Sequence, residues 1–166
     1  IKTYPEGRVS QYMAQLEVGD DVEMRGPKGS YNHTVNAAER VGMIAGGTGI
    51  TPVLSVIRAI LDDPNDHTHM TLLFANKTSE DVLLEHELND LERANGDRLK
   101  VYYTVDEPDE KWDGFSGRVT SEMLREVGMP TGGEGLMFMC GPPLMMTATR
   151  PSPTCSRRSV CAAAST

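Results

Sequence analysis

The chain has 166 residues, of which 39% are hydrophobic and 24% are charged, and its formal net charge at pH 7 is -8. This length and composition fit a soluble globular protein with one domain, or one domain with part of another. The acidic balance argues against nucleic acid as a partner, and no apolar run reaches the ~18 residues that a membrane span needs.

The first 31 residues resemble the end of a β-rich module. Alternating side chains at residues 22–25 predict a strand, and Ser10 is expected to cap a short helix that runs to Leu16. One or two strands cannot form a stable sheet by themselves. Because the chain also opens abruptly without an initiator methionine, we expect a fragment whose remaining strands lie upstream.

After a polar linker, apolar strands alternate with amphipathic helices. A glycine-rich turn joins the first strand to the first helix, where Thr51 is expected as the N-cap and Pro52 as the first helical residue. The first helix is expected to place Val53, Leu54, Ile57 and Leu61 on one face. The second is expected to begin at Thr78 or Ser79 and to bury Leu84, Leu88 and Leu91, and Gly128 is expected to close the third. The expected strands span residues 41–45, 70–75, 99–105 and 136–140, and the expected helices span residues 51–61, 79–94 and 120–127.

This alternation predicts an α/β fold with a parallel, doubly wound sheet. Right-handed crossovers place the carboxyl ends of all its strands at the same edge, where such sheets bind their ligands. The loops at residues 46–51, 74–76, 104–106 and 140–143 are therefore expected to line one crevice.

Residues 147–166 show neither a helical nor a strand period and are rich in Ser, Thr, Pro and Ala, so we expect a disordered tail. The cysteines have no C-x-x-C spacing, which predicts neither a disulfide framework nor a zinc site and makes a reducing compartment the default. They are Cys140, Cys155 and Cys161. His67 and His69 are expected in a solvated loop rather than in a metal site.

The glycine turn could hold a phosphate, because Gly46, Gly47 and Gly49 precede a helix start whose backbone N–H groups attract anions. It departs from the usual dinucleotide signature: Pro52 stands at the third glycine position, and no acidic residue follows the next strand. A Walker A motif is excluded because no Gly-Lys-Ser/Thr follows. A tight strand-to-helix connection without a ligand remains the alternative at this point.

Three further places could contact a ligand. Asp106 could accept ribose hydroxyls and repel a 2′-phosphate, which would favour NADH over NADPH, or it could be a solvated turn acid. Cys140 with Gly141 could receive a flat ring, although free cysteines are more often core residues. Arg8 and Ser10 could hold a diphosphate, or simply begin a capped helix. No Ser/His/Asp set stands out, which fits an enzyme whose reactive atoms belong to cofactors.

Several motifs, in their order and spacing, resemble the NADH–cytochrome b5 reductase family. This family belongs to the ferredoxin-reductase-like flavoenzymes, which also include the flavin domain of nitrate reductase. The resemblance covers about residues 1–146. The motifs that carry it lie at residues 41–52, 63–68, 72–76, 103–106, 112–113 and 139–143.

The resemblance implies an FAD-binding β-barrel followed by an NADH-binding α/β domain. Residues 1–35 would be the remnant of the barrel, residues 36–146 the NADH-binding domain, and residues 147–166 a tail outside the family pattern. It also implies hydride transfer from NADH to FAD, and electron transfer onward to a haem protein such as cytochrome b5. The full-length family is expected on the cytosolic side of the endoplasmic reticulum or the mitochondrial outer membrane, while this chain is expected to be soluble and cytoplasmic.

The same resemblance assigns site residues by position. Thr51 and Cys140 resemble the residues beside the reacting atoms. The FAD side would be formed by Lys2, Tyr4, Gly7, Arg8, Val9 and Ser10. The NADH side would be formed by Gly46, Gly47, Thr48, Gly49 and Pro52 at the pyrophosphate, Phe74, Ala75, Asn76 and Asp106 at the adenosine, and Cys140, Gly141, Pro142 and Met145 at the nicotinamide.

Two departures from the family pattern qualify its function. The early strands of the barrel have no counterpart, and residues 147–166 do not resemble the end of the family. We therefore expect this chain to bind FAD poorly and to turn over slowly. The alternatives are the flavin domain of a nitrate reductase-like enzyme, a nucleotide-binding module without redox activity, and a non-functional translated fragment.

Overall fold

The computed structural model describes residues 2–26, 31–130, 135–148 and 159–161. The chain divides into two compact units, residues 1–32 and residues 33–166, which we call the N-terminal unit and the sheet unit. The sequence places this boundary after residue 35 instead. No helix in the described part of the chain combines the length and the apolar character that a membrane span requires.

The N-terminal unit contains one short helix, α1 (Arg8–Ala14). The prediction that Ser10 caps a helix reaching Leu16 is wrong, because Gly7 occupies the N-cap position and Ser10 lies inside the helix. The Ser10 hydroxyl donates back to the Gly7 carbonyl at 3.0 Å. Residues 22–25 form no strand, since a lone segment has no neighbour in the described part of this unit with which to pair. No side chain of residues 2–26 is buried.

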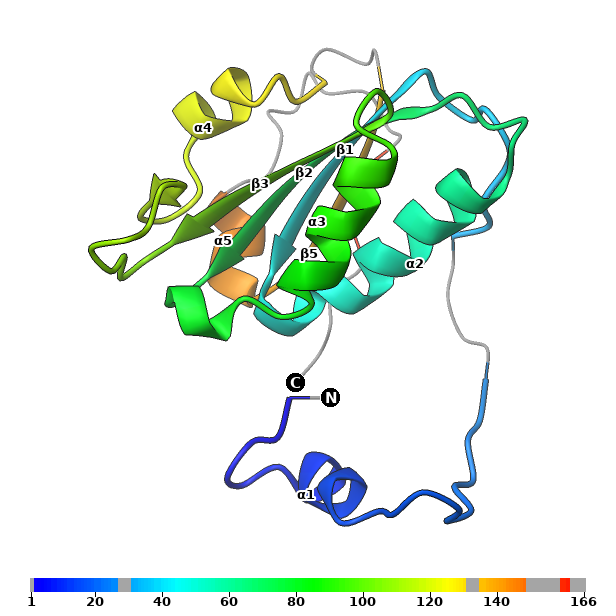
Figure 1. Ribbon diagram of the computed structural model, residues 1–166, viewed down its shortest axis with the longest axis vertical. Coiled ribbons are helices and arrows are strands. Elements are labelled where there is room, and N and C mark those ends of the chain that lie inside the picture. The colour runs from blue at the N-terminus through cyan, green and yellow to red at the C-terminus, as the bar shows by residue number, and fades with distance from the viewer. Residues whose placement is uncertain (1, 27–30, 131–134, 149–158, 162–166) are drawn as a thin grey trace. The chain divides into compact units, whose positions relative to one another are not determined.

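The sheet unit is built on a six-stranded sheet in the order β4-β3-β2-β1-β5-β6 (Figure 1). Every neighbouring pair is parallel, which confirms the α/β class and the parallel pairing that the sequence predicts. The strands are β1 (Arg40–Gly46), β2 (His69–Asn76), β3 (Leu99–Val105), β4 (Phe115–Ser116), β5 (Leu136–Cys140) and β6 (Ser159–Cys161).

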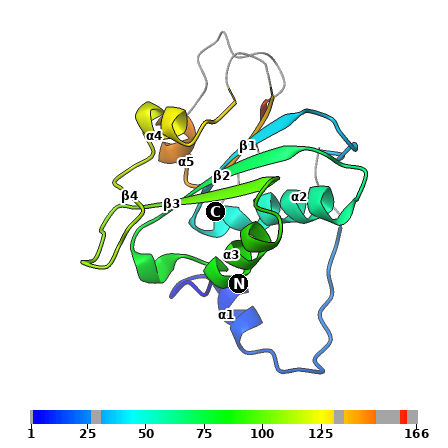
Figure 2. The ribbon, with the colours of Figure 1, turned by 45° about the horizontal axis from the view of Figure 1, so that its top comes forward.

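Helices cover both faces of this sheet. Figure 2 shows α2 (Ile50–Asp62) and α3 (Glu85–Ala94) on one face, and α4 (Ser121–Glu126) and α5 (Pro143–Ala148) on the other. The chain runs outward from β1 through β2 and β3, and then returns to place β5 on the opposite side of β1. The order of the strands therefore reverses between β1 and β5, which is the switch point where sheets of this kind bind ligands.

Alternate residues of the buried strands face different helices. Ile44 and Leu73 pack in one apolar cluster with Met123 of α4. The intervening residues, such as Met43 and Phe74, therefore face α2 and α3, and both are completely buried. Burial of such side chains stabilises the fold by ~1.5–3 kcal/mol each. The unit thus has two cores, and the sheet separates them.

The start of α2 differs from the prediction. A 3-10 turn, η1 (Gly47–Gly49), leads directly into the helix, so that α2 begins at Ile50 with Gly49 as its N-cap. Thr51 is therefore not the N-cap and Pro52 is not the first helical residue. The Thr51 hydroxyl instead donates to the Thr48 carbonyl at 3.1 Å. Because the backbone of the turn continues into the helix, no side-chain cap is needed there.

The second helix also begins later than expected. The segment Ser79–Asp81 forms a 3-10 turn, η2, and α3 starts only at Glu85. Leu84 has a φ of 58°, which interrupts the helix, and its side chain is 43% exposed rather than buried. Leu88 is completely buried, as predicted. Local composition favoured one continuous helix from residue 79, whereas the left-handed backbone at Leu84 separates η2 from α3.

The remaining differences concern edges and loops. The sequence does not predict β4 or β6, because pairing with the exposed N–H and C=O groups of an edge strand defines such short strands. Cys155 and residues 149–158 and 162–166 lie outside the described residues, so that a disordered tail stays a prediction there. The solvated loop predicted before β2 is only partly solvated, because Asp66 and Thr68 are buried. Gly128 ends α4 with a φ of 66°, as predicted.

Candidate functional site

The ends of four parallel strands define the candidate site. β1 ends at Gly46, β2 at Asn76, β3 at Val105 and β5 at Cys140. Because the strands are parallel, these ends share one edge of the sheet. Sequence reasoning placed its candidate NADH residues at these loops, and the structure brings the loops of β1 and β5 into direct contact.

Glycines make that contact possible. A Cβ atom on Gly49 would overlap the Cys140 carbonyl group and lie 3.0 Å from the Gly141 nitrogen. A Cβ atom on Gly141 would lie 3.1 Å from the Gly46 Cα. The backbones of the two loops therefore touch, and no side chain fits between them at Gly49 or Gly141. The adjoining prolyl ring and thioether are equally close, since a Cβ on Gly46 would lie 2.8 Å from Pro142 Cδ and 3.0 Å from Met145 Sδ.

Gly47 serves a different purpose from its neighbours. Its φ is 52°, a left-handed conformation that glycine adopts without steric cost, and a Cβ there would meet no atom within 4 Å. The turn is thus open on the side of Gly47 and closed on the side of Gly49. The first turn of α2 follows at once, with Thr51 and Pro52 exposed. The first N–H groups of a helix attract anions, so this open turn can hold a phosphate.

A backbone clip joins the loops that follow β2 and β3. The Asp106 N–H donates to the Asn76 carbonyl at 3.1 Å, and the Glu107 N–H donates to the Lys77 carbonyl at 2.8 Å. The hydroxyl of Ser79 also donates to the Asp109 carboxylate. This hydrogen bond is the main reason that the pKa of Asp109 lies below its ordinary value. The clip holds Asp106 beside the end of β2 with its side chain exposed. Sequence reasoning missed Ser79 and Asp109, whose only signal was an acid-rich loop opposite a helix start.

Asn76 is the unusual residue of this edge. It is only 9% exposed, and neither its side-chain oxygen nor its side-chain nitrogen has a hydrogen-bond partner. A buried amide without a partner is costly, and this one has both a donor and an acceptor to offer to a bound group. Asn76 alternates with Ala75 and therefore lies on the face of Phe74. No sequence pattern indicates that this amide lacks a partner.

The side chains of Phe74 and Cys140, which the sequence assigns to the site, are buried. Phe74 is completely buried, and the centroid of its ring lies 6.3 Å from the centroid of the Tyr103 ring. The structure thus uses Phe74 as a core residue that supports β2, and its side chain does not reach the surface of the site. Cys140 is 2% exposed at the end of β5, where its backbone contacts Gly49. Met145 on α5 is partly buried against Gly46 and Gly141.

The residues predicted for FAD form a compact turn within the N-terminal unit. The Gly7 N–H donates to the Tyr4 carbonyl at 3.0 Å, and the Tyr4 N–H donates to the Ser10 hydroxyl at 3.1 Å. The side chains of Tyr4 and Val9 are 46% and 76% exposed, and Arg8 is exposed as well. Lys2 is partly buried. This turn displays an aromatic ring and a guanidinium at the start of α1.

Metal chemistry finds no support in the described part of the chain, where no three His, Cys, Asp or Glu side chains are grouped so that they could hold an ion. His67 is exposed in the loop, as predicted, whereas His69 is also exposed but is the first residue of β2 rather than a loop residue.

Two family models match the chain. The oxidoreductase NAD-binding domain matches residues 43–151, and the oxidoreductase FAD-binding domain matches residues 1–33. The first match begins within β1 and contains β2, β3, β4, β5 and all four of the converging loops. The second match contains α1 and the turn before it.

The curated relatives include reductases from distant organisms. NADH-cytochrome b5 reductase 3 of Rattus norvegicus is 46% identical over 156 residues, which cover 84% of this chain and 52% of the relative. NADH-cytochrome b5 reductase 1 of Meyerozyma guilliermondii is 43% identical over 150 residues, with 90% and 53% covered. The chain thus spans about half the length of the curated relatives that it matches.

Solved structures give the same relationship. The cytochrome b5 reductase domain of Ulva prolifera nitrate reductase matches with a TM-score of 0.84 and 36% identity, covering 93% of this chain and 65% of that one. The CS-b5R domains of human Ncb5or match with a TM-score of 0.77 and 25% identity, covering 97% and 47%. Together with the family match over residues 43–151, these likenesses show that the chain belongs to the oxidoreductase NAD-binding domain family, with NADH–cytochrome b5 reductases among its relatives.

Proposed function

We propose that this chain is the NADH-binding part of an NADH–cytochrome b5 reductase-type oxidoreductase. It would bind NADH at the carboxyl edge of the sheet and, with FAD, pass electrons to a haem protein such as cytochrome b5. The observation that carries the proposal is the glycine contact between the loops of β1 and β5 at the switch point of the sheet. The relatives named NADH-cytochrome b5 reductase support the choice of reaction.

The pyrophosphate of NADH would lie on the open side of the glycine turn. Gly47 leaves space there, and the helix that follows offers backbone N–H groups. Gly46 and Gly49 would act indirectly, by keeping the turn against β5. Thr48 would add a hydroxyl on the same turn, and Pro52 would keep the exposed first turn of α2 rigid.

The adenosine would lie at the ends of β2 and β3. The side-chain amide of Asn76 fits a group that needs both a donor and an acceptor, such as a ribose diol or an adenine edge. The exposed carboxylate of Asp106 would accept ribose hydroxyls and repel a 2′-phosphate. Ala75 would line the strand end, and Phe74 would support it from the core.

The nicotinamide would lie over the loop after β5. Gly141 lets a flat ring approach the backbone, while the Met145 thioether and the Pro142 ring form an apolar wall. Thr51 and Cys140 would flank the reacting carbon, one exposed on α2 and the other at the end of β5. Their role would be to orient the ring and exclude water.

FAD would supply the hydride acceptor when it is bound. The turn formed by Tyr4, Gly7 and Ser10, with Arg8 exposed beside it, fits a phosphate or a ribityl chain. None of residues 2–26 is buried, however, so this stretch offers no enclosed surface for the flavin. We therefore expect the chain to hold FAD weakly and to turn over slowly.

Calorimetry of the purified chain with NADH and NADPH tests the nucleotide site. NADH should bind, NADPH should bind more weakly, and Asp106→Ser should reduce that preference by about tenfold, because a hydrogen-bonded charge is lost. Glu107→Ser is the matched control, because Glu107 is the next residue after Asp106 and its carboxylate pairs with Lys77 at 3.4 Å. Failure of the unmodified chain to bind NADH would refute the proposal.

Visible spectra after incubation with FAD, and ferricyanide reduction by NADH, test the flavin reaction. Stoichiometric, tightly held flavin with fast turnover would contradict the expected weakness. Nucleotide binding without flavin under any loading condition would favour the second candidate, a nucleotide-binding module without redox activity. The observation that supports this candidate is that none of residues 2–26 is buried.

Three finer assignments complete the proposal. The likeness to the Ulva prolifera nitrate reductase domain makes a nitrate reductase-type flavin domain a further candidate, which the acceptor preference of the full-length protein would distinguish. A location on the cytosolic side of the endoplasmic reticulum or mitochondrial outer membrane, and the absence of a nucleic-acid partner, follow from the family resemblance and the net charge of -8. Cell fractionation tests the location.

A further inference from the structure

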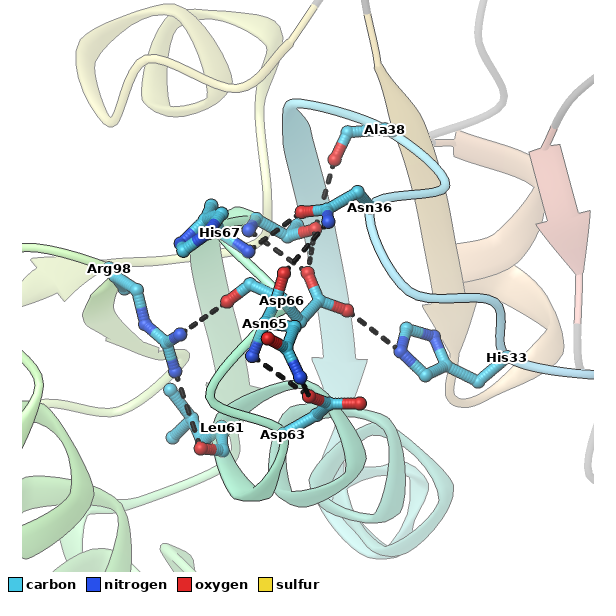
Figure 3. Close-up of polar contacts among 10 residues, drawn as sticks. His33, Asn36, Ala38, Leu61, Asp63, Asn65, Asp66, His67 and Arg98 are labelled. Atoms are coloured by element: carbon cyan, nitrogen blue, oxygen red, sulfur yellow. Dashed lines mark hydrogen bonds and ion pairs between the residues drawn. The ribbon is translucent and has the colours of Figure 1, made fainter.

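Asp66 lies at the edge of the sheet opposite the candidate site, just before β2 begins, and its side chain is completely buried. One carboxylate oxygen accepts the Thr68 backbone N–H at 3.0 Å and lies 2.6 Å from the Thr68 hydroxyl. The other oxygen lies 2.9 Å from the His33 ring nitrogen Nε2 (Figure 3). A buried carboxylate is costly unless it is fully hydrogen-bonded, so both sets of contacts matter.

The second carboxylate oxygen of Asp66 contacts a residue that is distant in the sequence. His33 is the first residue of the sheet unit, directly after the end of the N-terminal unit. An asparagine or serine at position 66 could also accept the Thr68 N–H within the loop, as such residues do in ordinary turns. Only a carboxylate offers two acceptor oxygens. Asp66 uses the second one to hold a residue that is distant in sequence.

Other hydrogen bonds fasten the same segment to the same loop. The Asn36 side chain donates to the Asn65 carbonyl at 2.8 Å and accepts the His67 N–H at 2.8 Å (Figure 3). Asn36 has a φ of 54°, a conformation that asparagine tolerates better than most residues. The Thr68 hydroxyl also lies 3.0 Å from the Ala38 carbonyl. The segment from residue 33 to residue 38 is thus held at three points.

The loop itself is tied to the body of the sheet unit. The guanidinium of Arg98 donates to the Asp66 carbonyl, and its other nitrogen donates to the Leu61 carbonyl at 3.4 Å. Arg98 directly precedes β3, and Leu61 lies in the last turn of α2. The titratable and charged groups in contact with the Asp66 loop or within it include His33 on the segment, Arg98 before β3 and Asp63 after α2.

We propose that Asp66 is a positioning residue that fixes residues 33–38, the start of the sheet unit, to the amino edge of the sheet. Residues 33–38 are thereby held in a defined place and move with the sheet. The proposal concerns the edge of the sheet opposite the candidate site and does not depend on NADH binding.

Backbone 15N relaxation of the full chain, compared between the unmodified protein and Asp66→Asn, tests the proposal. In the unmodified protein the order parameters of residues 34–38 should be near ~0.85, as in the strands, and in Asp66→Asn they should fall below ~0.6. Amide exchange at His67 should become about tenfold faster, because its acceptor Asn36 is released. The order parameters of β1 and β2 should not change, which separates a positioning role from a general loss of stability.

Two further variants keep the test decisive. Asn36→Gly retains the left-handed backbone but removes both side-chain hydrogen bonds, and should loosen the same residues even if Asp66→Asn does not fold. His67→Gln is the matched control, because only the backbone of His67 takes part and its side chain is exposed. Order parameters below ~0.6 in the unmodified protein, or unchanged values in a folded Asp66→Asn variant, would overturn the proposal; if Asp66→Asn does not fold, unchanged values in Asn36→Gly would do so.

Discussion

At the scale of single residues, Gly47 and Gly49 separate two uses of glycine in one turn. Gly49 needs a small side chain because the Cys140 carbonyl fills the space beside it, whereas Gly47 needs a left-handed φ in open space. Gly49→Ala should therefore lower the free energy of unfolding by ~1–3 kcal/mol, because backbone would have to move. Gly47→Asn should keep stability within ~0.5 kcal/mol, since asparagine tolerates this φ, and should weaken NADH binding.

Urea unfolding and NADH titration of the two variants measure these effects. The pair is informative because the changes lie two positions apart and should affect different properties. If Gly49→Ala unfolds like the unmodified chain, the loops of β1 and β5 are not in the close contact described here. If Gly47→Asn binds NADH normally, the pyrophosphate does not lie on the open side of the turn.

The buried Asp66 gives a prediction for the pH dependence of stability. Burial by itself would raise the pKa of Asp66, but hydrogen bonds from Thr68, Asn36 and His33 outweigh it and lower the pKa below its ordinary value. A group whose pKa is lower in the folded state stabilises the fold above the unfolded pKa, and this contribution is lost as the pH falls through the folded pKa. The contribution of Asp66 should thus be complete at neutral pH and disappear below ~pH 4.

Chemical unfolding of the unmodified chain and Asp66→Asn at several pH values measures this contribution. The difference in unfolding free energy should be ~1–3 kcal/mol at pH 7 and should shrink toward zero at strongly acidic pH. A difference that stays constant with pH would show that the ionised carboxylate is not what stabilises the loop.

At the scale of secondary-structure elements, the start of α3 shows how two residues of one expected helix face can differ. Leu88 is completely buried, whereas Leu84 is 43% exposed and has a positive φ. Leu88→Ala should cost ~2–5 kcal/mol through the cavity it leaves. Leu84→Gly should change stability by no more than ~1 kcal/mol, because relief of the strained φ offsets the lost apolar contact. Thermal unfolding followed by circular dichroism would compare them, and equal losses would contradict this boundary of α3.

At the scale of the whole molecule, all buried side chains of the described residues belong to the sheet unit. Deletion of residues 1–32 should therefore leave a cooperatively unfolding protein whose stability changes by less than ~1 kcal/mol. Calorimetric unfolding of the deletion variant provides the measurement. Loss of the cooperative transition would mean that the N-terminal unit contributes to the core after all.

Much of the sheet unit could be predicted from the chain itself. The apolar runs at β1, β2, β3 and β5, and the helical spacing of Val53, Leu54 and Ile57, are local patterns that report burial on one or both faces. The glycine turn, Asp106 and the loop after β5 could be named as one site for the same reason: the parallel order of the strands follows from their alternation with helices.

The errors occurred where neighbours rather than local sequence decide. Thr51 is a good N-cap by its local sequence, but Gly49 occupies the N-cap position because η1 leads directly into α2. The short strands β4 and β6 exist only because β3 and β5 offer free edges.

By itself the sequence determined the α/β class, the parallel sheet and the loops that meet at its carboxyl edge, because these depend on patterns within a few residues of each other. Only the tertiary structure decided that Gly49 presses on Cys140, that the amide of Asn76 is buried without a partner, and that Asp66 holds His33. The contacts of Gly49 and Asp66 are with residues that are far apart from them in the sequence. The lack of a partner for Asn76 depends on every residue that surrounds its side chain. Such information exists only once the chain has folded.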